Sequence, residues 1–115
     1  MSAVPKSEEI LLREERNGIC TLTMNRPAQM NLLTSGMLSA LQSAFEDLSK
    51  DKQVRVVILA AAGKGFCAGH DLKEIRELKE LPKIERLFGQ CSRMMQTITA
   101  LPQPVIARVQ GAAAP

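Results

Sequence analysis

The sequence predicts a mixed α/β fold that contains parallel strands. Three observations support this class: a hairpin signal near the N-terminus, two long segments with helical periodicity, and a continuous apolar segment between them. The helical segments are long enough to serve as crossovers between parallel strands. With 115 residues the chain has material for one small domain, which we expect to occupy residues 1–115.

The hairpin is indicated by two apolar segments on either side of Asn17-Gly18. Asn-Gly accepts the positive φ angles that a type I′ turn needs. We expect strands over residues 10–16 and 19–25. Arg26-Pro27 ends the second strand, because proline has no N–H to donate to a strand ladder.

Helical periodicity is clearest over residues 34–50, where apolar residues recur at spacings of three and four and Thr34 or Ser35 can serve as N-cap. A short charged helix is expected over residues 71–78, and a longer one from Pro82. The predicted core stripe of the longer helix contains Ile84, Leu87, Phe88, Cys91, Met94 or Met95, Ile98 and Leu101.

Two further strands are predicted from apolar segments. Residues 54–62 are apolar at odd and even positions alike, which is typical of a central parallel strand covered on both faces. Residues 105–109 form a second short strand that ends at Gln110-Gly111. Because glycine and small residues after a strand lead into another element, we expect the fold to continue beyond residues 112–115.

Composition excludes several classes of function. The net charge is +3, but basic residues alternate with acidic ones and Trp and Tyr are absent, so we expect no nucleic-acid partner. Three distant cysteines and one histidine indicate neither a zinc site nor a disulfide framework, but buried thiols in a reducing compartment. No apolar signal region or membrane-length segment is seen, so we expect a soluble, cytoplasmic protein without membrane contact.

The candidate site is the glycine-containing loop between the strand at 54–62 and the helix at 71–78. Open α/β sheets bind ligands at the carboxyl ends of their strands, where backbone N–H groups can face anions. Gly63, Gly65 and Gly69 do not match a Walker loop, which needs Gly-Lys-Ser/Thr, nor the Gly-x-Gly-x-x-Gly of dinucleotide sites.

The loop sequence Phe66-Cys67-Ala68-Gly69-His70-Asp71-Leu72-Lys73 resembles the Phe-x-Ala-Gly-x-Asp-Leu/Ile-Lys motif of the enoyl-CoA hydratase/isomerase (crotonase) family. Residues 24–33, 54–59 and 101–111 resemble, in order, that family's first turn, core strand and next strand. The resemblance implies the N-terminal part of a crotonase fold built of ββα units. It also implies assembly of the full-length form as a homotrimer or hexamer, and a coenzyme A thioester as substrate without a further cofactor.

The resemblance assigns a role to each motif residue. The backbone N–H of His70 becomes one of two donors of an oxyanion hole for the thioester enolate, and Gly69 lets the backbone approach the thioester. Ala68 would offer its carbonyl to the adenine. Lys73 would lie near the CoA nucleotide, or else be a solvated helix charge, and Leu72 completes the motif. Asp71 is expected to cap the helix start. Gly111 opens the loop that leads to the second donor.

The resemblance assigns a role to the backbone of His70 and none to its imidazole. The side chain is otherwise read as a neutral ring just before the helix. Ala28 replaces a family lysine, which removes one adenine contact. The other acids in the chain are read as surface charges, and the family's second donor and two catalytic glutamates would lie beyond Pro115. We therefore expect a fragment of an enoyl-CoA hydratase-like lyase or isomerase of fatty acid metabolism, inactive alone. The alternative is an inactive acyl-CoA-binding or partner-binding remnant.

Overall fold

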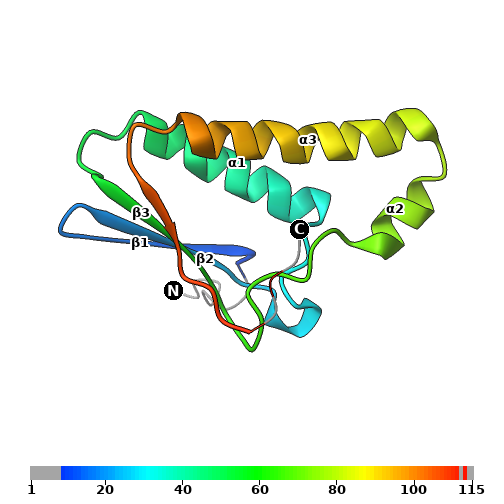
Figure 1. Ribbon diagram of the computed structural model, residues 1–115, viewed down its shortest axis with the longest axis horizontal. Coiled ribbons are helices and arrows are strands. Elements are labelled where there is room, and N and C mark those ends of the chain that lie inside the picture. The colour runs from blue at the N-terminus through cyan, green and yellow to red at the C-terminus, as the bar shows by residue number, and fades with distance from the viewer. Residues whose placement is uncertain (1–8, 112, 114–115) are drawn as a thin grey trace, which may run out of the picture.

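The computed structural model describes residues 9–111 and 113. Figure 1 shows a twisted sheet with two long helices together on one side of it. The strands lie in the order β1-β2-β3-β4. The elements follow the chain as β1 (Leu11–Arg16), β2 (Ile19–Met24), the 3₁₀ turn η2 (Pro27–Gln29), α1 (Ser35–Ser49), β3 (Val56–Ala61), α2 (Leu72–Leu78), α3 (Leu81–Ala100) and β4 (Val105–Ala107).

The predicted hairpin is confirmed. β1 and β2 pair antiparallel, from Leu11 opposite Met24 to Arg16 opposite Ile19. Asn17 and Gly18 have φ angles of 52° and 81°, as a type I′ turn requires. The turn therefore sets the register of the two strands.

β3 is the central parallel strand that its sequence predicts. It pairs in parallel with β2 on one side and with β4 on the other. The prediction that both of its faces are covered holds only in part for the described residues, since on the face away from the helices only Ala60 is buried. α1 and α3 lie on the same side of the sheet, so Val57 is buried while its neighbours Val56 and Ile58 remain half-buried.

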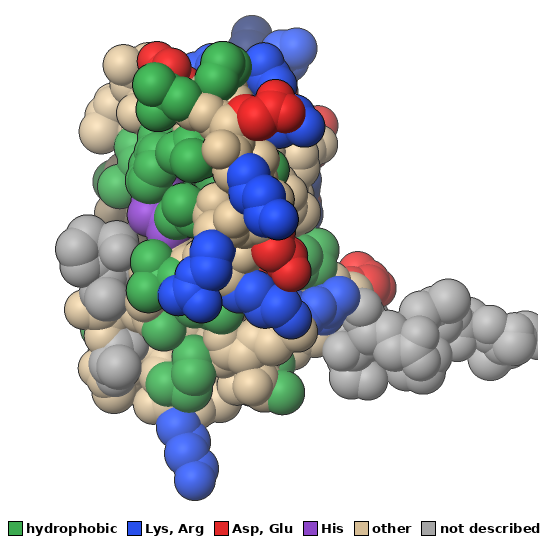
Figure 2. Space-filling model, turned by 90° about the vertical axis from the view of Figure 1, so that its right-hand side faces the viewer, with side chains coloured by type: hydrophobic (Ala, Val, Ile, Leu, Met, Phe, Trp, Pro, Cys, Tyr) green, Lys and Arg blue, Asp and Glu red, His purple; other side chains and the backbone are tan. Residues whose placement is uncertain are grey.

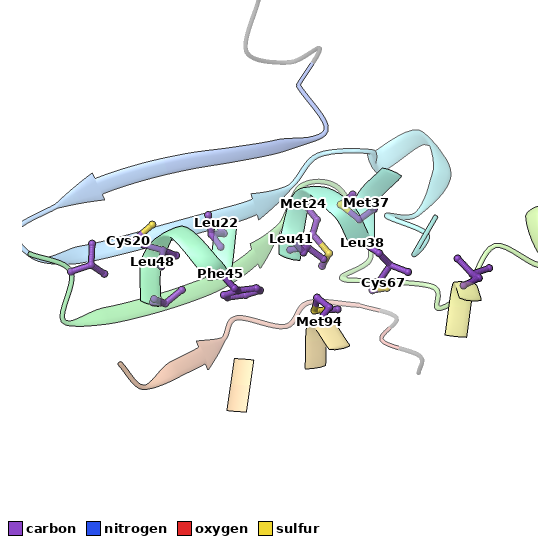
Figure 3. Packing of buried hydrophobic residues seen from close by; sticks show 13 residues of the cluster. Cys20, Leu22, Met24, Met37, Leu38, Leu41, Phe45, Leu48, Cys67 and Met94 are labelled. Carbon is purple, nitrogen blue, oxygen red and sulfur yellow. The ribbon is translucent and has the colours of Figure 1, made fainter. Parts of the chain in front are cut away.

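α1 forms where its periodicity predicts. The side chain of its N-cap, Thr34, accepts a hydrogen bond from the backbone N–H of Met37 at 3.1 Å, which satisfies one free donor of the first turn. The apolar face of the helix packs on β2, and Figure 3 shows the two sets of side chains in one cluster. The fully buried side chains of this cluster include Cys20, Leu22, Met37, Leu38, Phe45 and Leu48.

α3 has a wider apolar stripe than its neighbours cover. Leu87 and Met94 are buried, as predicted. Phe88 and Met95, which were also candidates for the core, are 43% and 56% exposed, because α1 contacts only one side of α3. Figure 1 shows this side-by-side packing.

The C-terminal strand is shorter than predicted. β4 ends at Ala107, and Val109 lies beyond it with its side chain exposed. The expected continuation after Gly111 falls largely outside the described residues, since of 112–115 only Ala113 is described, in an isolated bridge to Cys67. None of the described helices has the length and apolar character that crossing a membrane requires.

Candidate functional site

The predicted loop leaves the carboxyl end of β3 and enters α2. Parallel strands end at the same edge of a sheet, so the loop meets the segments that follow β2 and β4. These are the turn at residues 25–33 and the pair Gln110-Gly111. The motif is therefore held between two other parts of the chain.

The turn after β2 contacts the loop along its length. The side-chain amide of Asn31 donates to the carbonyl oxygens of Ala62 and Gly65, at 3.0 and 3.2 Å. Further along, the N–H of Ala68 donates to the carbonyl of Met30 at 3.0 Å.

The segment after β4 holds the opposite side of the loop. Gln110 donates from its side-chain amide to the carbonyl oxygens of Ala61 and Gly63, at 2.7 and 3.1 Å. Gly63 has a φ of 92°, a conformation that glycine adopts without steric cost.

One hydrogen bond fixes the orientation of the peptide group between Gly69 and His70. The N–H of Leu33 donates to the carbonyl oxygen of Gly69 at 2.8 Å. That oxygen and the N–H of His70 belong to the same trans peptide group, so they point in opposite directions. The N–H of His70 consequently points away from Leu33, and it has no acceptor among residues 9–111 and 113.

Gly69 has the conformation that its predicted role needs. It is buried, with a φ of 93° that side-chain-bearing residues rarely adopt. Its own N–H lies 3.4 Å from Sγ of Cys67. Gly69 is thus buried within the loop, and the N–H of the peptide that follows it points away from Leu33.

The imidazole of His70 packs against α3. Its ring and that of Phe88 form a T-shaped pair, with centroids 4.9 Å apart and an interplanar angle of 69°. Nδ1 is buried and has no hydrogen-bond partner among the described residues. Figure 2 shows hydrophobic side chains gathered beside the histidine. In the described part of the chain no cluster of His, Cys, Asp and Glu could hold a metal ion.

The acids near the loop serve helix ends. Asp71 caps α2 as predicted, accepting from the N–H of Lys73 at 3.1 Å. Glu74, read as a surface charge, is half-buried at the surface and has a structural contact that its sequence does not reveal. Its carboxylate accepts from the N–H and Oγ of Ser35 at the start of α1, at 2.9 and 3.1 Å. Both carboxylates are therefore engaged away from the N–H of His70.

The other predicted site residues lie on the surface. Ala68 and Lys73 are exposed, Leu72 is 70% exposed, and Gly111 lies against the loop at Lys64. The structure brings Gly111 to the loop but leaves Leu72 and Lys73 pointing to solvent on α2.

The cysteines are free thiols. Cys20 and Cys67 are buried, as expected, and Cys91 is half-buried. Burial raises the pKa of the Cys20 and Cys91 thiols above its ordinary value. A raised pKa disfavours the reactive thiolate form of both residues.

Two open clefts lie away from the loop. One of about 550 Å³ lies between Ser35, α2 and α3, and another of about 580 Å³ lies between β1 and α1. Neither is lined by Gly69 or His70. The candidate site is therefore placed at the motif loop because of the backbone groups there, and not at either of the two clefts.

Comparison with known proteins identifies the family. A sequence profile described as enoyl-CoA hydratase/isomerase matches residues 14–115, so the chain belongs to the enoyl-CoA hydratase/isomerase family. The chain is 37% identical over 109 residues to the mitochondrial enoyl-CoA hydratase domain-containing protein 3 of Danio rerio, covering 93% of this chain and 37% of that protein. It is 32% identical over 112 residues to 1,2-epoxyphenylacetyl-CoA isomerase of Escherichia coli, covering 92% and 42%.

Solved structures agree on the fold. An enoyl-CoA hydratase from Mycobacterium smegmatis matches with a TM-score of 0.86 and 50% identity, over 89% of this chain and 40% of that one. Human enoyl-CoA hydratase domain-containing protein 3 matches with a TM-score of 0.84 and 33% identity, over 90% and 41%. The mixed α/β fold is thus that of crotonase structures over about 40% of their chains. The chain spans about two fifths of the length of these relatives.

Three residues with clear structural roles were missed by sequence reasoning. Asn31 lay inside the segment that resembles the family's first turn, but nothing local assigns its side chain a partner. Gln110 and Glu74 likewise bond to residues more than 35 positions away. Short motifs do not report such long-range contacts.

Proposed function

We propose that this chain provides one half of an acyl-CoA thioester site, in which the backbone N–H of His70 stabilises the enolate-like oxygen of the thioester. The orientation of the Gly69–His70 peptide supports this most directly, because its N–H points away from Leu33 and has no acceptor in the described structure. Fixed donors aimed at developing charge contribute about 10²–10³ in rate each.

The neighbouring residues would hold the rest of the CoA ester. Ala68 precedes Gly69 and is exposed, and its carbonyl would accept from an adenine amino group. Lys73 is exposed in the first turn of α2, where its ammonium group would face a nucleotide phosphate. Asp71 and Leu72 set the start of that helix, and Gly111 leads toward the second donor. The substrate is an acyl-CoA, with no further cofactor.

The reaction class follows from family membership, and we infer hydration of an α,β-unsaturated acyl-CoA or isomerisation of its double bond. Both reactions need a proton-transferring group near the thioester. Asp71 and Glu74 are engaged at helix ends, so we place that group and the second donor in another part of the family fold. The active form would be a homotrimer or hexamer of the full-length protein.

Binding of acyl-CoA without turnover is the second candidate. The engagement of both carboxylates near the loop favours it, because one backbone donor by itself binds a thioester without supplying a proton. Turnover by the protein that carries this sequence decides between the two candidates.

The test compares Gly69→Val with His70→Ala in the protein that carries this sequence, with crotonyl-CoA as substrate. We expect Gly69→Val to lower kcat/KM by about 10² or more, because a branched side chain displaces the donor peptide. His70→Ala keeps the backbone N–H and should keep activity within about tenfold.

Thermal unfolding of both variants separates loss of the site from loss of the fold. A non-reactive acyl-CoA thioether should also shift the ¹⁵N amide resonance of His70. A loss with His70→Ala as severe as with Gly69→Val would contradict the backbone role and assign the chemistry to the imidazole.

A further inference from the structure

Two side-chain amides from different turns hold the same short stretch of the loop. Asn31 donates to the carbonyls of Ala62 and Gly65, and Gln110 donates to those of Ala61 and Gly63. Four of the five carbonyls at positions 61–65 thus accept from a primary amide. We call Asn31 and Gln110 the amide clamp.

Asn31 is the more constrained of the two. Its side chain is completely buried, and its Oδ1 accepts from the N–H of Arg26 at 2.7 Å while Nδ2 donates twice. It also has a φ of 52°, in the left-handed region that asparagine tolerates better than most residues. A primary amide offers two donors and an acceptor without charge, which a carboxylate of the same shape cannot.

The contacts of Asn31 continue into the peptide that carries the candidate donor. Two nearby residues of the same turn also bond the loop. The carbonyl of Met30, just before Asn31, accepts from the N–H of Ala68, and the N–H of Leu33, two residues after it, donates to the carbonyl of Gly69. The last of these bonds orients the N–H of His70. A shift of Asn31 relative to residues 62–65 would therefore also move the bonds that Met30 and Leu33 make to the loop.

We propose that Asn31 is a positioning residue, which with Gln110 anchors the loop so that the N–H of His70 faces the thioester. This inference rests on the proposed function, and Asn31 itself touches no reacting atom. A role in stability alone is the competing explanation, because burying an unpaired polar group also weakens the whole fold.

Asn31→Asp and Asn31→Ala separate the two roles. A buried aspartate places its charge against the carbonyl oxygens of Ala62 and Gly65, and its burial raises its pKa. When protonated it recovers one donor. Alanine recovers none at any pH. The charged or titratable residues in the contacting segments are Arg26, Lys64, His70 and Asp71. Lys64 is exposed, Asp71 is engaged as the cap of α2, and Asn31→Ala carries the same four residues, so it controls for their titration.

The experiment measures amide hydrogen exchange in the protein that carries this sequence, without ligand. For Asn31→Asp at pH 7.5 we expect protection at Ala68 and Gly69 to fall by about tenfold or more, with protection at Leu22 and Val57 within about twofold of the parent. The loss should shrink at pH 5 for Asn31→Asp and persist for Asn31→Ala. Gln29→Glu is the matched control, because Gln29 is exposed on the same turn, and should change nothing.

Turnover of crotonyl-CoA adds the second readout. Asn31→Asp should lower kcat more than it changes KM, with recovery toward low pH, as expected if a donor used in the transition state is displaced. Should Asn31→Asp fail to fold, Gln110→Glu tests the same clamp from its half-buried side, with the same pattern of exchange.

An equal loss of protection in the loop and in β2 and β3 would reduce the clamp to a stability role. Unchanged loop exchange, or lost protection with unchanged kcat, would overturn the proposal. A parent protein with no turnover sinks the proposed function, while the exchange pattern still decides whether the clamp anchors the loop.

Discussion

Gly111 lies against the carbonyl group of Lys64 with no space for a side chain between them. A Cβ on Gly111 would collide with that carbonyl oxygen and would come within 3.3 Å of Cα of Gly65. Gly111 also has a φ of 59°, in the left-handed region. The segment that follows β4 is thus packed directly on the motif loop, although Gly111 and Lys64 lie more than 40 residues apart in sequence.

Gly111→Ala should therefore lower the free energy of unfolding by about 1–3 kcal/mol, because the methyl group must displace the Lys64 carbonyl or the chain after β4. Chemical denaturation of the protein that carries this sequence measures this change and those predicted below for Gly89, Glu74 and Cys20. An alanine variant as stable as the parent would mean that this contact opens readily in solution.

Gly89→Ala should raise the free energy of unfolding. Gly89 lies within α3, and a Cβ there would have the guanidinium of Arg93 as its nearest neighbour, at 3.5 Å. Replacing a helical glycine with alanine stabilises the helix by about 0.5–1 kcal/mol. The same denaturation series serves as the measurement, and destabilisation would contradict the open environment of this position.

Glu74→Gln should lower the free energy of unfolding by about 1 kcal/mol, because Glu74 places a negative charge and two acceptor contacts at the N-terminus of α1. Glu77→Gln is the matched control, since Glu77 lies on α2 like Glu74 and is exposed. Equal effects of the two substitutions would show that the contacts with Ser35 contribute nothing.

Stability should fall as the pH rises above the ordinary thiol pKa of about 8.5. Burial raises the pKa of Cys20, so the unfolded chain releases this proton at a lower pH than the folded protein does. The contribution is complete below pH 8 and is lost as the pH rises toward the folded-state pKa. Denaturation at pH 7.5 and 10 should show a smaller decrease for Cys20→Ala than for the parent.

The 115-residue chain alone should not hydrate crotonyl-CoA, because the described residues place one backbone donor and no free carboxylate at the loop. It should bind a dye specific for apolar surface, since Leu81, Phe88, Met95, Ile106 and Val109 are exposed. Turnover above the uncatalysed rate, or cooperative unfolding as a monomer without dye binding, would contradict this expectation.

Local signals explain which elements the sequence predicts well. Asn17-Gly18 needs no distant partner to favour its turn, and Thr34 caps a helix through the backbone three residues away. Phe88 and Met95 show what local signals do not predict. Periodicity shows that α3 has a wide apolar stripe, but which part of it is buried depends on where α1 lies.

The sequence by itself determined the hairpin, the helices, the parallel arrangement around β3 and the motif loop that marks the family. These depend on turn chemistry, capping and periodicity, which act over a few residues. The tertiary structure alone decided that Asn31 and Gln110 donate to the loop, that Gly111 packs on Lys64, and that the N–H of His70 points away from Leu33. Each of these contacts joins segments more than 30 residues apart, and they meet only because parallel strands end at one edge of the sheet.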